Sequence, residues 1–334
     1  MKEWRFWVAE QRGTLTAVGI FVVMFAIYLV NHPAITSNGF TVTAVGNVVQ
    51  TAANKAVLLA FVAMAQTLVV LTAGIDLSVG MVFTLTNCVA SWIVVGSPWQ
   101  TAMGVVGVLA VGAACGAING VIVIYGGCSR SSPTIATGAV YYGIALAIRP
   151  DPGGSVNGDL ADLLTGKIFD VVPASLVTLA VVVLIVWVPF SRSVTGRAAY
   201  AVGSSEVAAY MSGVPIRRAK FVAYTLSGLL SAMGGLFLTF FTYTGDAAYA
   251  SGSGYTLFSI AAVVLGGVSL FGGRGSVIGA IFGALAFRTI GDLLFVFNFD
   301  PLWQPLFQGV VLLLAVSLSA FGLFRVRNRL EWFG

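Results

Sequence analysis

The chain has 334 residues, of which 58% are hydrophobic and only 9% are charged, and its mean hydropathy is +0.96. Because a soluble domain carries about 25% charged residues, this composition excludes a water-soluble globular protein and predicts an integral membrane protein. The net charge of +5 is better explained by membrane topology than by binding of nucleic acid.

Apolar runs long enough to cross a bilayer, about 20 residues, recur along the whole chain. The first run is expected to be an uncleaved span, because no short apolar region with a small-residue cleavage site precedes Asn31. Bounded by Gly, Pro, Asn or charge, the runs predict helices at 14–31, 55–73, 77–95, 101–125, 133–149, 172–190, 217–241, 255–271, 276–297 and 302–323. The expected fold is therefore all-α, with one transmembrane domain over residues 1–334. Eight helices plus a re-entrant hairpin are the alternative.

Basic residues orient these helices. With the N-terminus inside, the inner segments hold thirteen of the seventeen Lys and Arg residues, namely Lys2, Arg5, Arg12, Arg130, Arg192, Arg197, Arg217, Arg218, Lys220, Arg274, Arg325, Arg327 and Arg329. Positive charge concentrates on the cytoplasmic side of membrane proteins. Both termini and the loop 191–216 are thus predicted to be cytoplasmic, and the loop 150–171 to lie outside.

An acid interrupts an apolar run in "LTAGIDLSVG", residues 71–80. Here Gly74 would allow a tight break between two helices, Asp76 would cap free N–H groups around Ser78, and Gly80 would allow close packing of the new helix. A structural cap is the main interpretation of Asp76, and a place on a substrate pathway or in proton coupling is the alternative. A similar break is predicted at 269–279, on the same inner side.

Polar or amphipathic side chains within predicted spans are the candidates for lining a pathway. They are Asp76, Asn87, Asn119, Tyr141, Tyr142 and Tyr243. Hydrogen bonding between helices, or anchoring at the membrane interface, is the competing explanation for each of them.

Glycines repeat every four residues at Gly112, Gly116 and Gly120, and again from Gly275 to Gly283. Spacing by four places each set on one helix face, where backbones can approach closely. We expect tight packing within one subunit, with an interface between subunits as the alternative.

Motifs for catalysis or metal binding are missing from the sequence. The lone His32 has no nucleophile assigned to it, there is no HExxH or CxxC, and the GK pair at Lys167 lacks the rest of a phosphate-binding loop. We therefore expect no catalytic site, metal site or cofactor on this chain. Uphill transport would then need an ion gradient or another subunit, and Asp76 and Asp292 are the intramembrane acids that an ion-driven carrier could use.

The segment "SSEVAAYM", residues 204–211, predicts a short helix within the cytoplasmic loop. Ser204 or Ser205 can cap its start, Glu206 suits its positive end, and Gly213 can end it. Its apolar side chains would be exposed to water, which indicates a partner. A surface helix folded back onto the membrane is the alternative.

Three stretches together resemble the permease subunit of ABC importers for simple sugars, of the ribose, xylose, arabinose and galactofuranose type. They are "LTAGIDLSVG", "GRAAYAVGSSEVAAYMSGVPIRRAKFVAYTLSGLLSAMGG" and "SIAAVVLGGVSLFGGRGSVIGAIFGAL". The resemblance implies a type II-like importer fold in the bacterial inner membrane, and a second permease subunit, identical or homologous. It also implies cytoplasmic ATPase subunits that bind ATP and Mg²⁺, and a periplasmic sugar-binding protein. The outer loop 150–171 is long and acidic, and we expect it to dock the binding protein, with a solvated loop as the alternative.

By the same resemblance, the short cytoplasmic helix couples the permease to the ATPase. The implied coupling residues are Ser204, Ser205, Glu206, Val207, Ala208, Ala209, Tyr210, Met211, Ser212 and Gly213, flanked by Arg197 and Arg217. The chain departs from the family pattern at "GSS", 203–205, and at "GGCSRSSPTIATG", 126–138. An ion-coupled transporter of a small polar solute, an ABC permease for a nucleoside or branched-chain amino acid, and a membrane scaffold or channel are the rival hypotheses.

Overall fold

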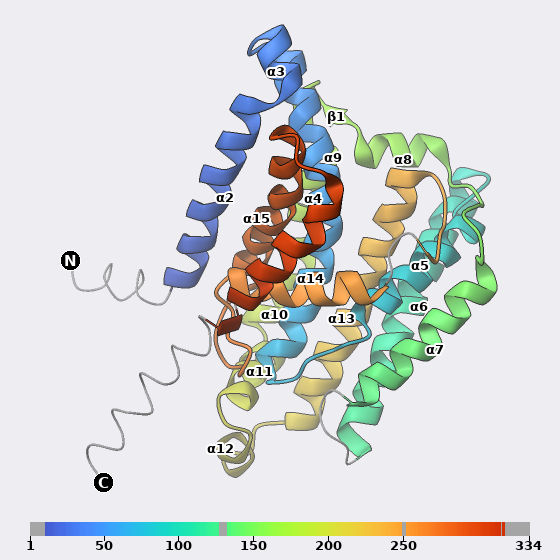
Figure 1. Ribbon diagram of the computed structural model, residues 1–334. Coiled ribbons are helices and arrows are strands. Elements are labelled where there is room, and N and C mark those ends of the chain that lie inside the picture. Colours follow the sequence, from blue (N-terminus) through green and yellow to red (C-terminus); the bar gives the residue numbers. More distant parts are fainter. Residues whose placement is uncertain (1–10, 127–131, 249–251, 315, 318–334) are drawn as a thin grey trace, which may run out of the picture.

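The computed structural model describes residues 11–126, 132–248, 252–314 and 316–317 (Figure 1). Both predicted cytoplasmic termini lie outside these residues, as do residues 127–131 of the inner turn that departs from the family pattern. Helices make up most of the described chain, whose one sheet is the antiparallel pair β1 (Lys167–Ile168) and β2 (Val172–Pro173). This architecture confirms an all-α fold.

The helices follow one another with short connections. In chain order they are α2 (Arg12–Asn31), α3 (Pro33–Asn38), α4 (Val42–Leu71), α5 (Val79–Ile93), α6 (Pro98–Tyr125), α7 (Ser132–Ile148), α8 (Gly158–Thr165), α9 (Ala174–Val182), the π-helix η1 (Val183–Trp187), α10 (Val188–Arg192), α11 (Val194–Ser204), α12 (Glu206–Met211), α13 (Ile216–Thr242), α14 (Gly252–Leu265), α15 (Val277–Val296) and η2 (Pro301–Trp303), which continues as helix to Leu314.

Each of the ten predicted segments contains a helix within the described residues, but the predicted bounds are too wide in places: residues 172–173 belong to β2, and α14 ends at Leu265 rather than at residue 271. Among the described residues, six helices are long and apolar enough to cross a membrane: α2, α4, α6, the continuous run α9–η1–α10, α13 and α15. Shorter apolar helices are α5, α7, α14 and the segment Pro301–Leu314. With 15 and 14 residues, α5 and α14 reach about 21–23 Å at 1.5 Å per residue, less than the roughly 30 Å hydrocarbon core. To cross the bilayer, these two helices therefore need the non-helical segments next to them in the chain.

The central helix is α4, which is buried along most of its length against α13, α14 and α15. It begins at Val42, whereas the sequence predicted a start at residue 55. The polar residues Gln50 and Asn54 lowered the hydropathy there, but both donate a side-chain hydrogen bond to the carbonyl of Thr165, at 2.8 Å. The first turns of α4 therefore hold the end of α8, on the outer side, by these two hydrogen bonds.

Helices α6 and α13 pack through small residues. A Cβ at Gly116 would lie 2.2 Å from the Tyr224 carbonyl oxygen, and one at Gly228 would lie 2.1 Å from the Gly112 carbonyl oxygen. Similarly, a Cβ at Gly283 would lie 2.1 Å from the Ala262 carbonyl oxygen of α14. Both sets of glycines thus serve packing within one chain, as expected, but the prediction that Gly275 shares a helix face with Gly279 and Gly283 is wrong, because Gly275 precedes α15 and has φ +119°.

The two ends of the molecule carry different short elements (Figure 1). One end holds α3, α8 and the β-hairpin, and the other holds α11 and α12. The loop predictions for two segments are partly wrong. The outer segment 150–171 contains α8 and β1, and residues 194–204 of the inner segment form α11.

Candidate functional site

The break between α4 and α5 centres on Asp76, which is buried. Its Oδ1 accepts hydrogen bonds from the Ser78 N–H at 2.9 Å and the Ser78 hydroxyl at 2.7 Å. Since Ser78 is the N-cap residue of α5, the carboxylate stabilises the start of that helix. The hydrogen bond predicted between Asp76 and the N–H of Ser78 is therefore present, although the side chain of Ser78 caps no N–H group within α5 itself.

Gly74 lies in the tight break between α4 and α5, as predicted, and its N–H donates to the Val69 carbonyl oxygen at 3.2 Å. The residue with left-handed backbone is Ala73, with φ 57°. A Cβ at Gly74 would lie 3.0 Å from both the Tyr224 hydroxyl oxygen and a side-chain carbon of Val69. Glycine is therefore favoured there by close packing rather than by φ. Gly80 is buried, and its N–H donates to the Thr256 hydroxyl at 3.1 Å.

A buried chain of hydrogen bonds leads away from the cap. Asn119 of α6 donates through Nδ2 to the Ser78 Oγ at 2.7 Å. In turn, Tyr141 of α7 donates to Asn119 Oδ1 at 3.2 Å, and its hydroxyl also lies 3.1 Å from the Cys115 carbonyl oxygen. The structure thus brings together three of the predicted pathway residues, Asp76, Asn119 and Tyr141.

Two threonines from other helices complete this cluster, and sequence reasoning missed both. The Thr134 hydroxyl accepts from the Leu77 N–H at 3.0 Å, and Thr256 of α14 contacts Gly80 as described above. Neither threonine stands in a recognisable motif, since only the fold places it at the break. The cluster offers hydroxyls, an amide and one carboxylate, groups that suit hydrogen bonding to a polar solute.

The other predicted pathway residues lie apart from this cluster. Asn87 donates to the Thr239 hydroxyl at 2.9 Å, and its Oδ1 accepts from the Asp246 N–H at 2.9 Å. Tyr142 is half-buried. Tyr243 is exposed, and its hydroxyl donates to Asp162 of α8, which raises the pKa of Tyr243. Asn87 and Tyr243 therefore connect helices at the outer end.

The short cytoplasmic helix forms as α12. Ser205 is its N-cap and accepts from the Ala208 N–H at 3.3 Å, whereas Ser204 is the last residue of α11. Gly213 follows with φ +71°, the left-handed conformation that ends helices. The exposed apolar face is confirmed: the side chains of Val207, Tyr210 and Met211 are 75%, 74% and 80% exposed.

An ion pair joins α12 to α13. Glu206 pairs with Lys220 at 2.6 Å. On the same side, the Arg217 guanidinium lies 5.5 Å from the ring centroid of Tyr125, while Arg197 is exposed on α11. A groove of about 570 Å³ runs between α12, the start of α13 and the end of α6.

Helix α11 joins α12 to both helix breaks. The Tyr200 hydroxyl donates to the Gly275 carbonyl oxygen at 2.8 Å. The Gly273 N–H donates to the Leu71 carbonyl oxygen at 3.2 Å, so the two breaks touch each other. A Cβ at Gly203 would lie 2.0 Å from the Leu71 carbonyl oxygen and 2.4 Å from the Gly273 nitrogen. Sequence reasoning did not select Tyr200 or Gly203, although both lie in a stretch that carried the resemblance.

Comparison with known proteins identifies the family. The family described as "Branched-chain amino acid transport system / permease component" matches residues 47–316. The ribose import permease protein RbsC of Escherichia coli (strain K12) is 33% identical over 318 residues, which cover 94% of each chain. The fructose import permease protein FrcC of Rhizobium meliloti is 35% identical over 271 residues, which cover 77% of this chain and 73% of its own.

A third relative, the D-allose transport system permease protein AlsC of Escherichia coli (strain K12), is 28% identical over 319 residues, which cover 94% of this chain and 92% of its own. No solved structure matches the chain. The chain therefore belongs to this family of transport-system permease components, and its resemblance to sugar importer permeases is confirmed.

Proposed function

We propose that this chain is the membrane-spanning subunit of an ATP-driven importer that moves a monosaccharide into the cell. The names of the three relatives, which transport ribose, fructose and allose, support a sugar as substrate. The buried cluster around Asp76 and Asn119 supplies hydrogen-bonding groups suited to sugar hydroxyls. The chain is a multi-pass protein of the inner membrane, and its family is a membrane component without an ATPase of its own.

The exposed apolar face of α12 carries the coupling part of the proposal. Val207, Tyr210 and Met211 project into water at the cytoplasmic end, where an apolar patch without a partner is unfavourable. An ABC ATPase that covers this face would bind its ATP and Mg²⁺ itself. Its closure on ATP would move α12, and the helix pair α11–α12 would pass that movement to the two breaks. The ATPase can shift the permease only by binding its two states with different affinity.

Co-purification tests this assignment. Tyr210→Asp places a charge on the apolar face of α12 and should abolish association with the ATPase. Val194→Asp is the matched control, because Val194 is also cytoplasmic, apolar and 67% exposed but lies at the far end of α11. Deletion of residues 204–211 should act like Tyr210→Asp. If both α12 variants still bind the ATPase, α12 is not the docking element.

Uptake measurements separate this proposal from an ion-driven carrier. The intramembrane acids are both engaged, since Asp76 accepts a hydrogen bond from the Ser78 N–H and Asp292 lies 3.6 Å from Lys55. We expect uptake in vesicles to require ATP and the ATPase and to survive collapse of the ion gradients. Uptake driven by a gradient through this chain alone would contradict the proposal.

The remaining partners follow from the importer architecture. We propose that a second permease subunit completes the pore and that a periplasmic binding protein docks at the outer end, on α8 and the β-hairpin. The bond from Tyr243 to Asp162 ties α8 to α13 and would make this surface firm. Binding-protein affinity, measured across pentoses, hexoses and furanose forms, would identify the sugar.

A further inference from the structure

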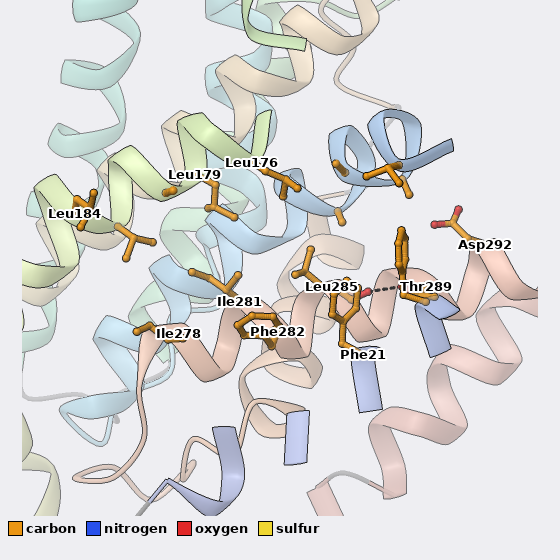
Figure 2. A pocket seen from close by; sticks show the side chains of 17 residues that line it. Phe21, Leu176, Leu179, Leu184, Ile278, Ile281, Phe282, Leu285, Thr289 and Asp292 are labelled. Carbon is orange, nitrogen blue, oxygen red and sulfur yellow. Dashed lines mark hydrogen bonds between the residues drawn. The ribbon is translucent and has the colours of Figure 1, made fainter. Parts of the chain in front are cut away.

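An apolar groove of about 660 Å³ runs along the membrane-facing side of the molecule (Figure 2). Helices α2, α4, α9 and α15 line it, and α2 leaves most of its surface uncovered. Figure 2 shows Leu184 near one end of the groove and Asp292 at the other, with Ile281, Phe282 and Leu285 of α15 between them. The groove therefore follows α15 from its inner half to its outer end.

A polar cavity of about 580 Å³ adjoins the groove at this outer end. Asp292 lines both spaces, so they lie next to each other. The cavity is lined by both charged and neutral polar side chains, among them His32, Lys55, Arg288, Asp292 and Gln304.

The charges of the cavity do not cancel. Lys55 and Asp292 form an ion pair at 3.6 Å, which leaves the Arg288 guanidinium as an additional positive group. Burial lowers the pKa of the His32 ring, so this residue is neutral at pH 7 and adds no charge. The Arg288 Nε is buried without a hydrogen-bond partner among the described residues. A buried guanidinium N–H of this kind needs an acceptor, and an anionic oxygen is the strongest one.

We propose that the groove and the cavity together bind one phospholipid of the outer leaflet. One acyl chain occupies the groove, and the lipid phosphate binds Arg288 and Lys55 in the cavity. The geometry matches a lipid because the charged end lies toward the outer surface and the apolar part extends from it toward the membrane interior. Each buried methylene of the acyl chain adds about 0.8 kcal/mol, while the charge-assisted contacts fix the phosphate.

The test measures lipid retention by the purified full-length chain. Native mass spectrometry in a nonionic detergent should show one bound 1-palmitoyl-2-oleoyl-phosphatidylglycerol. Arg288→Gln and Lys55→Gln should each weaken retention about tenfold or more, because each removes a charge-assisted contact. The matched control is Lys167→Gln, which removes an outer lysine that bonds Asn47 away from the cavity. This control should retain the lipid fully.

A second pair of variants tests the groove without touching the charges. Ala180 lines the groove and is exposed, so Ala180→Trp fills the groove with little risk to folding. Val181, its neighbour, is 44% exposed and does not line the groove. Ala180→Trp should displace the lipid and Val181→Trp should not. This pair keeps the proposal open to refutation even if the charge variants fail to fold.

Three results would overturn the proposal. Equal retention of the phosphate-free 1-palmitoyl-2-oleoyl-glycerol would show that the cavity does not recognise phosphate. Thermal stabilisation by inorganic phosphate alone, as large as that by the lipid, would identify a small-anion site instead. Absence of bound lipid, together with a change from dimer to monomer in Ala180→Trp, would show that a second copy of the chain covers the groove.

Discussion

At the scale of single residues, Asp76 joins the start of α5 to the buried cluster. Its Oδ1 accepts two hydrogen bonds from Ser78, and an asparagine at this position keeps an oxygen acceptor. Asp76→Asn should therefore retain folding. By contrast, Asp76→Ala leaves the buried Ser78 groups without that acceptor and should cost about 1–3 kcal/mol of stability. Thermal unfolding in detergent would measure both variants.

Transport by the same variants separates capping from a direct role in the pathway. If capping is all that Asp76 provides, Asp76→Asn transports at close to the normal rate. Normal stability with a strong loss of uptake would instead place the carboxylate on the substrate pathway.

Tyr200 is the residue through which α11 holds the second break. Tyr200→Phe removes its hydrogen bond to the Gly275 carbonyl oxygen and should cost about 1 kcal/mol. Burial raises the pKa of Tyr200 to about 12. The folded state thus favours the protonated phenol, and the stability this provides is present below the ordinary pKa near 10 and is lost as the pH rises toward 12.

The pH dependence checks the Tyr200 prediction directly. Because the phenol stays protonated through about pH 6–9, the difference in unfolding temperature between the wild type and Tyr200→Phe should be constant over that range. A difference that varied within it would mean that another titrating group acts on this contact.

At the scale of elements, the packing of α6 on α13 leaves no room for side chains at its glycines. A Cβ at Gly116 would lie 2.2 Å from the Tyr224 carbonyl oxygen, whereas one at Gly143 of α7 would meet nothing within 4 Å. Gly116→Ala should therefore force the helices apart and cost about 1–3 kcal/mol. Gly143→Ala should be neutral or slightly stabilising, since Ala is the better helix former. Equal melting temperatures for the two variants would contradict the close packing.

The accuracy of the sequence predictions also varied between elements. Apolar runs located the long helices because lipid contact demands hydrophobicity over a whole span. The first turns of α4 were missed because Gln50 and Asn54 are polar, yet the side-chain amide of each donates a hydrogen bond to the Thr165 carbonyl oxygen. Helix α11 was missed because Gly196 and Gly203 argue against a helix locally, while tight packing of both against neighbouring backbone outweighs that preference.

At the scale of the whole molecule, the sequence could show which residues were polar within the spans but not which of them meet. Asp76, Asn119 and Tyr141 come from the α4–α5 break, α6 and α7, and only their packing unites them. The exposed face of α12 was predictable because it depends on local periodicity alone. Contact between the two breaks was not, since their residues stand about 200 positions apart and share no local pattern.

The contact between the two helix breaks leads to a prediction about transport by the whole molecule. Gly203 touches the ends of both breaks through the Leu71 carbonyl oxygen and the Gly273 nitrogen. In Gly203→Ala the new Cβ would push α11 away from them, at a cost of about 1–3 kcal/mol, while the exposed face of α12 is unchanged. The assembled transporter should therefore still bind the ATPase and hydrolyse ATP, but sugar uptake should fall well below that of the wild type.

Gly19→Ala is the control for this experiment, because Gly19 of α2 has nothing within 4 Å of an added Cβ. Assembly, ATP hydrolysis and uptake would be measured on the same preparations of both variants. Loss of uptake with hydrolysis retained only in Gly203→Ala would show that movement reaches the pathway through α11 and the joined breaks. Normal uptake in Gly203→Ala would mean that α12 acts through α13 instead, to which the Glu206–Lys220 pair also connects it.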